Sequence, residues 1–328
     1  MNNSRGVVLC RSRRSALTAL LATLACTLPA CSKRAPLRIS GHPWPGYEPI
    51  FFAETQKQLT DAVLLQHLPT IKDSIDALRG GTVDAAMLTL DEALALQAQG
   101  MNLQVILVMD VSKGADALVA SKQYQTVTQL RGKRIGLEQS TLGELMLSMV
   151  LDKAGLKRAE IKPVFFAFEE QEAAYSANKI DALITYEPVV GRLVAKGANK
   201  LLSTRDLPES IFDVLVVKTD VARDYAQALE QTLRGHFWAL EQLQRNPWDT
   251  AYRMVPHAGV SAEELVESFR GLELPDLIAN RRYLSRDNGQ LTGIVEKLSA
   301  IMLASGNIKK PANAANLFTD AYLPRSHS

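Results

Sequence analysis

Two aromatic residues and a carboxylate form the first group in this sequence that could bind a small molecule. Trp44, Tyr47 and Glu48 follow a short predicted strand over residues 37–40, and prolines and a glycine surround them. Aromatic rings can stack on a flat ligand or face a cation. The alternative is that this segment only packs a turn. We favour a binding pocket, because large apolar side chains are costly to expose in an ordinary loop.

An internal repeat supplies a second pair of candidate residues. Between residues 77–102 and 174–199, identical residues recur at a constant offset of 97 positions (174 − 77), among them Ala77, Asp84, Ala85, Gly100 and Asn102. Each copy predicts a helix end, a short buried strand and a second helix, which indicates two similar lobes with a cleft between them. Thr89 and Tyr186 end the two strands, so both are expected to face the cleft, although Thr89 could instead cap the next helix. Asp84 and Asp181, at the opposite strand ends, are expected to be structural.

The third candidate group lies at a predicted strand-to-helix junction. Ser140 and Thr141 are placed where the free N–H groups of a helix start can attract an anion. Thr141 and Glu144 also have the spacing of a capping box. We therefore expect Thr141 to cap the helix and Ser140 to contact a ligand.

Carboxylates form the fourth group. Glu187 follows Tyr186 directly, and Glu48 and Asp213 are expected to add negative charge to the same cleft, while Lys and Arg are scarce at the predicted strand ends. A cleft rich in carboxylates favours a cationic or neutral ligand over nitrate or a sulfonate. The alternative for Glu187 is an acid stabilised by the dipole at a helix N-terminus.

Other function classes have little support in the residues. The histidines His42, His67, His236, His257 and His327 lack paired metal-ligand spacing, and neither a nucleophile elbow nor a phosphate-binding loop occurs. We expect no enzyme activity, no cofactor and no metal site. Loss of four arginines with a leader would leave 33 basic and 35 acidic residues (37 − 4 = 33), a net charge near −2 (33 − 35) that predicts no nucleic-acid partner.

The N-terminus is predicted to be a lipoprotein signal peptide. Arginines precede an apolar run over residues 16–28, which ends in a Leu-Pro-Ala-Cys segment resembling the bacterial lipobox. Cleavage would leave Cys31 as the lipidated first residue. We expect a protein on the periplasmic side of the cell envelope, anchored to a membrane through acyl chains, palmitate among them, on Cys31. The twin-arginine and the general export routes both remain open.

Strands and helices alternate along the chain, which predicts parallel β-α-β units. We expect an α/β fold whose boundaries are a signal peptide over 1–30, a tether over 31–36, a first lobe over 37–123, a second lobe over 124–210, and a return strand with C-terminal helices over 211–328.

Four segments resemble the nitrate/sulfonate/taurine group of ABC-transporter substrate-binding proteins, which includes binders of thiamine-pyrimidine precursors. They are His-Pro-Trp-Pro-Gly-Tyr-Glu-Pro at 42–49, Val-Asp-Ala-Ala at 83–86, Leu-Arg-Gly-Lys-Arg-Ile-Gly at 130–136, and Tyr-Glu-Pro at 186–188. The resemblance implies a type II periplasmic binding protein fold: two α/β lobes, two crossovers and hinge closure. It also implies that residues 212–218 return to the first lobe, and that relatives often hold a sulfonate near the Ser140 position.

The predicted function follows from this resemblance. We expect a monomeric solute-binding lipoprotein that captures a small molecule and delivers it to an ABC permease in the inner membrane. The alternatives are a binding protein that signals to a membrane sensor, or an envelope scaffold with a degenerate cleft.

Overall fold

The computed structural model describes residues 34–207, 209–285 and 289–325, and its main folded unit spans Pro36–Ser328. The predicted signal peptide and the predicted lipidation site at Cys31 lie outside the described residues. None of the helices in the described part of the chain is long and apolar enough to cross a membrane.

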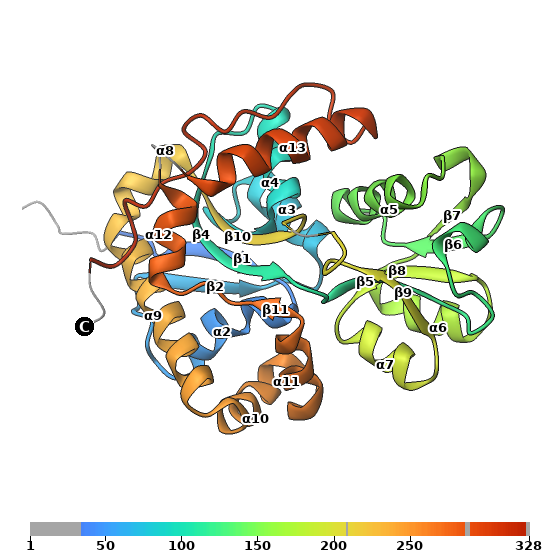
Figure 1. The fold of residues 1–328 in the computed structure, drawn as a ribbon. Coiled ribbons are helices and arrows are strands. Elements are labelled where there is room, and N and C mark those ends of the chain that lie inside the picture. Colours follow the sequence, from blue (N-terminus) through green and yellow to red (C-terminus); the bar gives the residue numbers. More distant parts are fainter. Residues whose placement is uncertain (1–33, 208, 286–288, 326–328) are drawn as a thin grey trace, which may run out of the picture. The chain divides into compact units, whose positions relative to one another are not determined.

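The fold is built on two β-sheets (Figure 1). The first sheet has six strands in the order β11-β4-β10-β3-β1-β2. Their bounds are β1 Leu37–Gly41, β2 Val63–His67, β3 Ala85–Thr89, β4 Leu103–Ser112, β10 Phe212–Lys218 and β11 Leu272–Glu273. The second sheet has the order β7-β6-β8-β5-β9. Its strands are β5 Asp116–Ala120, β6 Arg134–Leu137, β7 Lys162–Phe165, β8 Ala182–Tyr186 and β9 Asn199–Ser203.

Helices cover both faces of each sheet. In Figure 1, α3 and α4 lie on one face of the first sheet and α2 on the other, while α5 lies opposite α6 and α7 on the second. This burial from both sides explains why all five residues of β3 and of β5 are buried and four of the five in each strand are apolar. The helices around the two sheets are α2 Glu48–Thr55, α3 Ile71–Gly80, α4 Leu90–Ala98, α5 Thr141–Ala154, α6 Phe168–Ser176 and α7 Val189–Ala195.

The chain crosses between the sheets twice, and the first crossing is earlier than expected. β5 pairs with β8 and β9, so it belongs to the second sheet. The predicted end of the first lobe at residue 123 is therefore wrong by one strand, because the chain leaves the first sheet between β4 and β5. The expected return of residues 212–218 is confirmed, since β10 pairs with β3 and β4 in the first sheet.

The internal repeat is confirmed at the level of side-chain contacts. The Asp84 carboxylate accepts hydrogen bonds from the backbone N–H and the guanidinium of Arg38 at 2.7–3.1 Å. Asp181 accepts the equivalent bonds from Arg134 at 2.9–3.1 Å. Both aspartates are structural, as expected, although each ties a strand to its parallel neighbour rather than closing a helix-to-strand turn.

The C-terminal part is less helical than the sequence suggests. Its helices are α8 Thr219–Ala222, α9 Ala226–Arg245, α10 Pro247–Ala258, α11 Ala262–Arg270, α12 Leu277–Leu284 and α13 Gln290–Ala304. Pro256 lies inside α10 without ending it. Residues 305–325 form turns and irregular structure along the first sheet, where Phe318 bridges to Val105.

Candidate functional site

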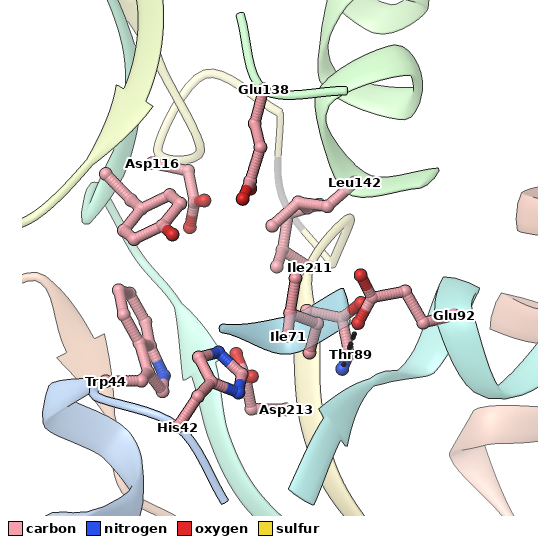
Figure 2. Close-up of a pocket in the computed structure, with 11 residues that line it drawn as sticks. His42, Trp44, Ile71, Thr89, Glu92, Asp116, Glu138, Leu142, Ile211 and Asp213 are labelled. Atoms are coloured by element: carbon pink, nitrogen blue, oxygen red, sulfur yellow. Dashed lines mark hydrogen bonds between the residues drawn. The ribbon is translucent and has the colours of Figure 1, made fainter. Parts of the chain in front are cut away.

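A buried cavity lies where the ends of strands from the two sheets meet (Figure 2). It has room for about 20 Å³, close to the space of one ordered water molecule. The residues that line it come from both sheets and from the adjoining helices: His42, Trp44, Ile71, Thr89, Glu92, Asp116, Glu138, Leu142, Tyr186, Ile211 and Asp213. Trp44, Thr89, Tyr186 and Asp213, which the sequence singles out as ligand-binding candidates, are thus brought together.

Aromatic rings from both sheets meet at one side of the cavity. Trp44 precedes the short 3-10 helix Pro45–Tyr47, and its ring packs edge-on against Tyr186 with centroids 5.4 Å apart. Tyr186 in turn stacks on Phe168 at 4.3 Å. Trp44 therefore contacts the second sheet from the first, and the pair forms an aromatic wall that spans both.

The polar part of the cavity is acidic. Glu92 and Asp213 come from the first sheet and its helices, and Asp116 and Glu138 come from the second. In Figure 2 the carboxylates of Asp116 and Glu138 point into the cavity from above the remaining side chains. Among the described residues that line the cavity, none is Lys or Arg.

Burial perturbs the ionisation of these groups. It raises the pKa of Asp116 to about 6 and the pKa values of Glu92, Glu138 and Asp213 above their ordinary range. Burial lowers the pKa of His42 to about 3, so its imidazole is neutral near pH 7 and supplies no positive charge. The cavity therefore combines several carboxyl groups with no compensating cation along its lining.

A pair of aspartates lies beneath the aromatic wall. Asp213 on β10 pairs directly with Asp110 on β4 and, on its other side, with Thr89 on β3. The Trp44 indole N–H donates to Asp110 at 3.0 Å, and the Tyr47 hydroxyl donates to Asp213 at 2.5 Å. These bonds explain the Trp-Pro-Gly-Tyr segment, since its two aromatic residues each bind one member of the pair.

Gly46 is required by the same arrangement. Its Cα approaches the Asp110 carboxylate so closely that a Cβ at this position would overlap the carboxylate oxygen. The glycine between the two aromatic residues therefore lets the loop close over Asp110.

Five predicted ligand residues lie outside the cavity lining: Tyr47, Glu48, Glu187, Ser140 and Thr141. Tyr47 is fully buried below it. Glu48 is 2% exposed and accepts from His257 at 2.9 Å, within a cluster on α2 and α10. Glu187 accepts from the backbone N–H of Gly191 at 2.9 Å, which matches its alternative role at the start of α7.

The prediction that Thr141 caps α5 is wrong, because Ser140 takes that position. Ser140 is the N-cap of α5, and its hydroxyl accepts from the N–H of Gly143 at 3.1 Å, while Thr141 is the first helical residue. Glu144 pairs with Arg158 instead of completing a capping box. Both Ser140 and Thr141 lie beside a neighbouring surface pocket that also contacts Glu92 and Glu138.

Several lining residues were missed by the sequence analysis. His42 and Glu138 directly follow β1 and β6, so the rule that ligands bind at strand ends could have found them. Glu92 and Asp116 carry no such signal, because Glu92 lies inside a helix and Asp116 begins its strand. The apolar lining residues Ile71, Leu142 and Ile211 are typical core residues in the sequence.

Comparison with known proteins places the chain in a family. The sequence profile of the NMT1-like family matches residues 31–253. The chain belongs to the NMT1-like family. A protein of Brucella abortus (strain 2308) that is named as a binding protein is 21% identical over 255 residues, which cover 76% of this chain and 77% of that one.

Solved structures confirm the predicted fold. The periplasmic aliphatic sulphonate binding protein of Escherichia coli aligns with a TM-score of 0.73 at 16% identity, over 88% of this chain and 99% of that protein. The desulfurization enzyme DSZB aligns with a TM-score of 0.63 at 16% identity, over 88% and 97%. The NMT1-like chain therefore has the two-lobed fold of periplasmic binding proteins, and both binding proteins and an enzyme share it.

Proposed function

We propose that this protein is a solute-binding protein that captures a small organic cation and delivers it to an ABC importer. The observation that carries the proposal is the cavity lining, in which Glu92, Asp116, Glu138 and Asp213 face one another without Lys or Arg among the described lining residues. The family and the fold of its relatives support the binding role.

The charge of the lining sets the ligand class. At an effective dielectric constant of about 20, a unit charge about 4 Å from a carboxylate interacts with it by about 4 kcal/mol, attractively for a cation and repulsively for an anion. A sulfonate in this cavity would meet several carboxyl groups and no cationic side chain from the described lining. The proposed ligand class therefore differs from the sulphonate named for the Escherichia coli relative.

The apolar side of the cavity favours an organic ligand. Ile71, Leu142 and Ile211 lie opposite the aromatic wall and offer no group to a hydrated ion. Among the described residues, no group of His, Cys, Asp and Glu side chains is arranged to hold a metal ion. An ammonium or amidinium group with a hydrocarbon or aromatic body fits both the carboxyl groups and the apolar contacts.

Capture requires the lobes to separate and close again. The cavity of about 20 Å³ is smaller than an organic cation, so the ligand must enter an open form. Contacts between the lobes favour the closed form: Trp44 packs on Tyr186, and Arg192 on α7 pairs with Glu264 on α11 at 2.5 Å. Closure with a ligand held between the walls gives the form that a permease would recognise.

Isothermal titration tests the proposed ligand class. We expect butylammonium, benzylammonium and 1,4-diaminobutane to bind, and taurine and butanesulfonate to show no heat. Butylammonium and butanesulfonate are a matched pair, because they share the same hydrocarbon body. Tight binding of butanesulfonate together with no binding of any amine would refute the proposal.

The cellular setting is part of the proposal. We propose a monomer on the periplasmic side of the envelope, anchored by lipid on Cys31 and acting without catalysis. Metabolic labelling with palmitate should mark the wild-type protein and leave Cys31→Ala unlabelled. Equal labelling of both proteins would contradict the anchor without affecting the proposed ligand class.

A further inference from the structure

Asp110 and the lining residue Asp213 form a buried aspartate pair that no cationic side chain of the described residues contacts. The two residues face each other across neighbouring antiparallel strands, and both are at most 3% exposed. Within the described part of the chain, the side-chain donors to the pair are neutral groups, the Trp44 indole N–H on Asp110 and the Tyr47 hydroxyl on Asp213. Two adjacent carboxylates in such a site repel each other and cannot both ionise at low cost.

A count of hydrogen-bond donors points to one shared proton. Asp110 Oδ1 is buried and receives no donor from the described protein groups, and Asp213 is its direct neighbour on the adjacent strand. Both carboxyl groups are acceptors when ionised. A hydrogen bond between the two carboxyl groups therefore requires that one of them be protonated.

The groups around the pair add negative rather than positive charge. Glu92 on α4 and Asp116 on β5 face it with carboxyl groups, and His42 at the end of β1 is neutral. Trp44 and Tyr47 close it from the 3-10 helix, and Thr89 flanks it on β3. Burial raises the pKa of Asp110 to about 7, and burial together with the Asp110 charge raises the pKa of Asp213 well above its ordinary value.

We propose that the Asp110–Asp213 pair holds one proton in the ligand-free protein and releases it when the cation binds, so that the site exchanges a proton for its ligand. The balance is simple: the protonated pair and a cation give the ionised pair with bound cation and one proton in solvent. This inference rests on the proposed function. Asp110 would then contribute to the specificity for cations, although Asp110 does not line the cavity.

The shared proton can be tested without any ligand. Difference infrared spectroscopy near pH 7 should show the C=O stretch of a protonated carboxylic acid that is stronger in the wild type than in Asp110→Asn, because the substitution removes the shared proton while other buried carboxyl groups keep theirs. Asp84→Asn is the control, because Asp84 is also buried but its pKa lies below the ordinary value. An Asp110→Asn spectrum that retains the full band would overturn the shared proton.

The exchange is tested by titration with butylammonium, whose own amine stays charged because alkylammonium groups titrate near pH 10. Measurement in phosphate and in Tris near pH 7 separates the heat of buffer protonation from that of binding. We expect about one proton released per ligand, and affinity that rises about tenfold per pH unit between about pH 7 and about pH 8, above the pKa of about 6 of the lining residue Asp116. In Asp110→Asn, if it binds, the affinity should change less than about twofold over that range.

The outcomes separate the two proposals. Binding of butylammonium without proton release overturns the exchange and leaves the cation function intact. Failure of every amine to bind overturns the proposed function and the exchange with it. A folded Asp110→Asn variant, checked by circular dichroism, that binds with the wild-type pH dependence also overturns the exchange.

Discussion

Removal of the Asp84 carboxylate should destabilise the first lobe by a predictable amount. In Asp84→Ala the backbone N–H of Arg38 loses its 3.1 Å acceptor, and the guanidinium loses bonds of 2.9 and 2.7 Å. A donor left without a partner costs about 1–3 kcal/mol, and a half-exposed ion pair contributes about 0–1 kcal/mol. We therefore expect a loss of about 2–3 kcal/mol in the free energy of unfolding.

Urea denaturation followed by circular dichroism measures this loss. The matched variant is Asp181→Ala, which removes the equivalent carboxylate from the second lobe. It should cost less, because the Asp181 and Arg134 side chains are 19% and 43% exposed, whereas those of Asp84 and Arg38 are 9% and 36% exposed. A loss below about 1 kcal/mol for Asp84→Ala, or a larger loss for Asp181→Ala, would refute the reasoning from burial.

The pH dependence of the same contact has a defined sign. Burial tends to raise the pKa of Asp84, but the bonds from Arg38 outweigh it and the pKa lies below its ordinary value. Its contribution to stability is therefore present above the unfolded pKa near 3.9 and is lost as the pH falls toward the folded pKa. The difference between wild type and Asp84→Ala should shrink on acidification below about pH 4, and a constant difference would contradict this assignment.

Three further predictions concern the cavity. Glu138→Gln should weaken butylammonium binding by about 10- to 100-fold in calorimetry, since a hydrogen bond to a charged group contributes about 1.5–3 kcal/mol; unchanged affinity would remove Glu138 from the site. Gly46→Ala should lower the free energy of unfolding in urea by about 1–3 kcal/mol, because its Cβ would overlap the Asp110 carboxylate, and a neutral substitution would show that the loop can move. Arg192→Ala should enlarge the radius of gyration in X-ray scattering and weaken binding by about two- to fivefold through loss of the Glu264 contact. Lys196→Ala is its control, because Lys196 pairs with Glu172 inside the second lobe, and equal effects of both variants would argue against an interlobe contact.

The sequence predicts local elements well where the spacing of apolar residues agrees with the Gly and Pro residues that end helices and strands. Each copy of the repeat contains the predicted short buried strand, Ala85–Thr89 and Ala182–Tyr186, followed by a helix. The structural role of Asp84 and Asp181 also follows, because the repeat places both at the start of a short buried strand. These features could be predicted because they depend on residues that are close to one another in the sequence.

Features that depend on contacts distant in sequence could not be predicted in this way. The strand at Asp116–Ala120 follows β4 directly, yet it pairs with strands more than 60 residues later, so the apolar pattern alone cannot assign it to a sheet. Asp110 directly follows the apolar run over residues 105–109, and its role depends on the register with Asp213, 103 residues away (213 − 110). Ser140 and Thr141 are adjacent possible caps, and only the backbone geometry decides between them.

Identifying the natural ligand and its charge is the most direct test of the claim that this protein binds an organic cation. Native mass spectrometry of protein purified from its own cell envelope, without denaturation, should show a bound small molecule. Its release should yield an organic cation that carries an ammonium, amidinium or protonated heterocycle, and Glu138→Gln protein should carry less of it. A released sulfonate or other organic anion, retained equally by Glu138→Gln, would contradict the cation site.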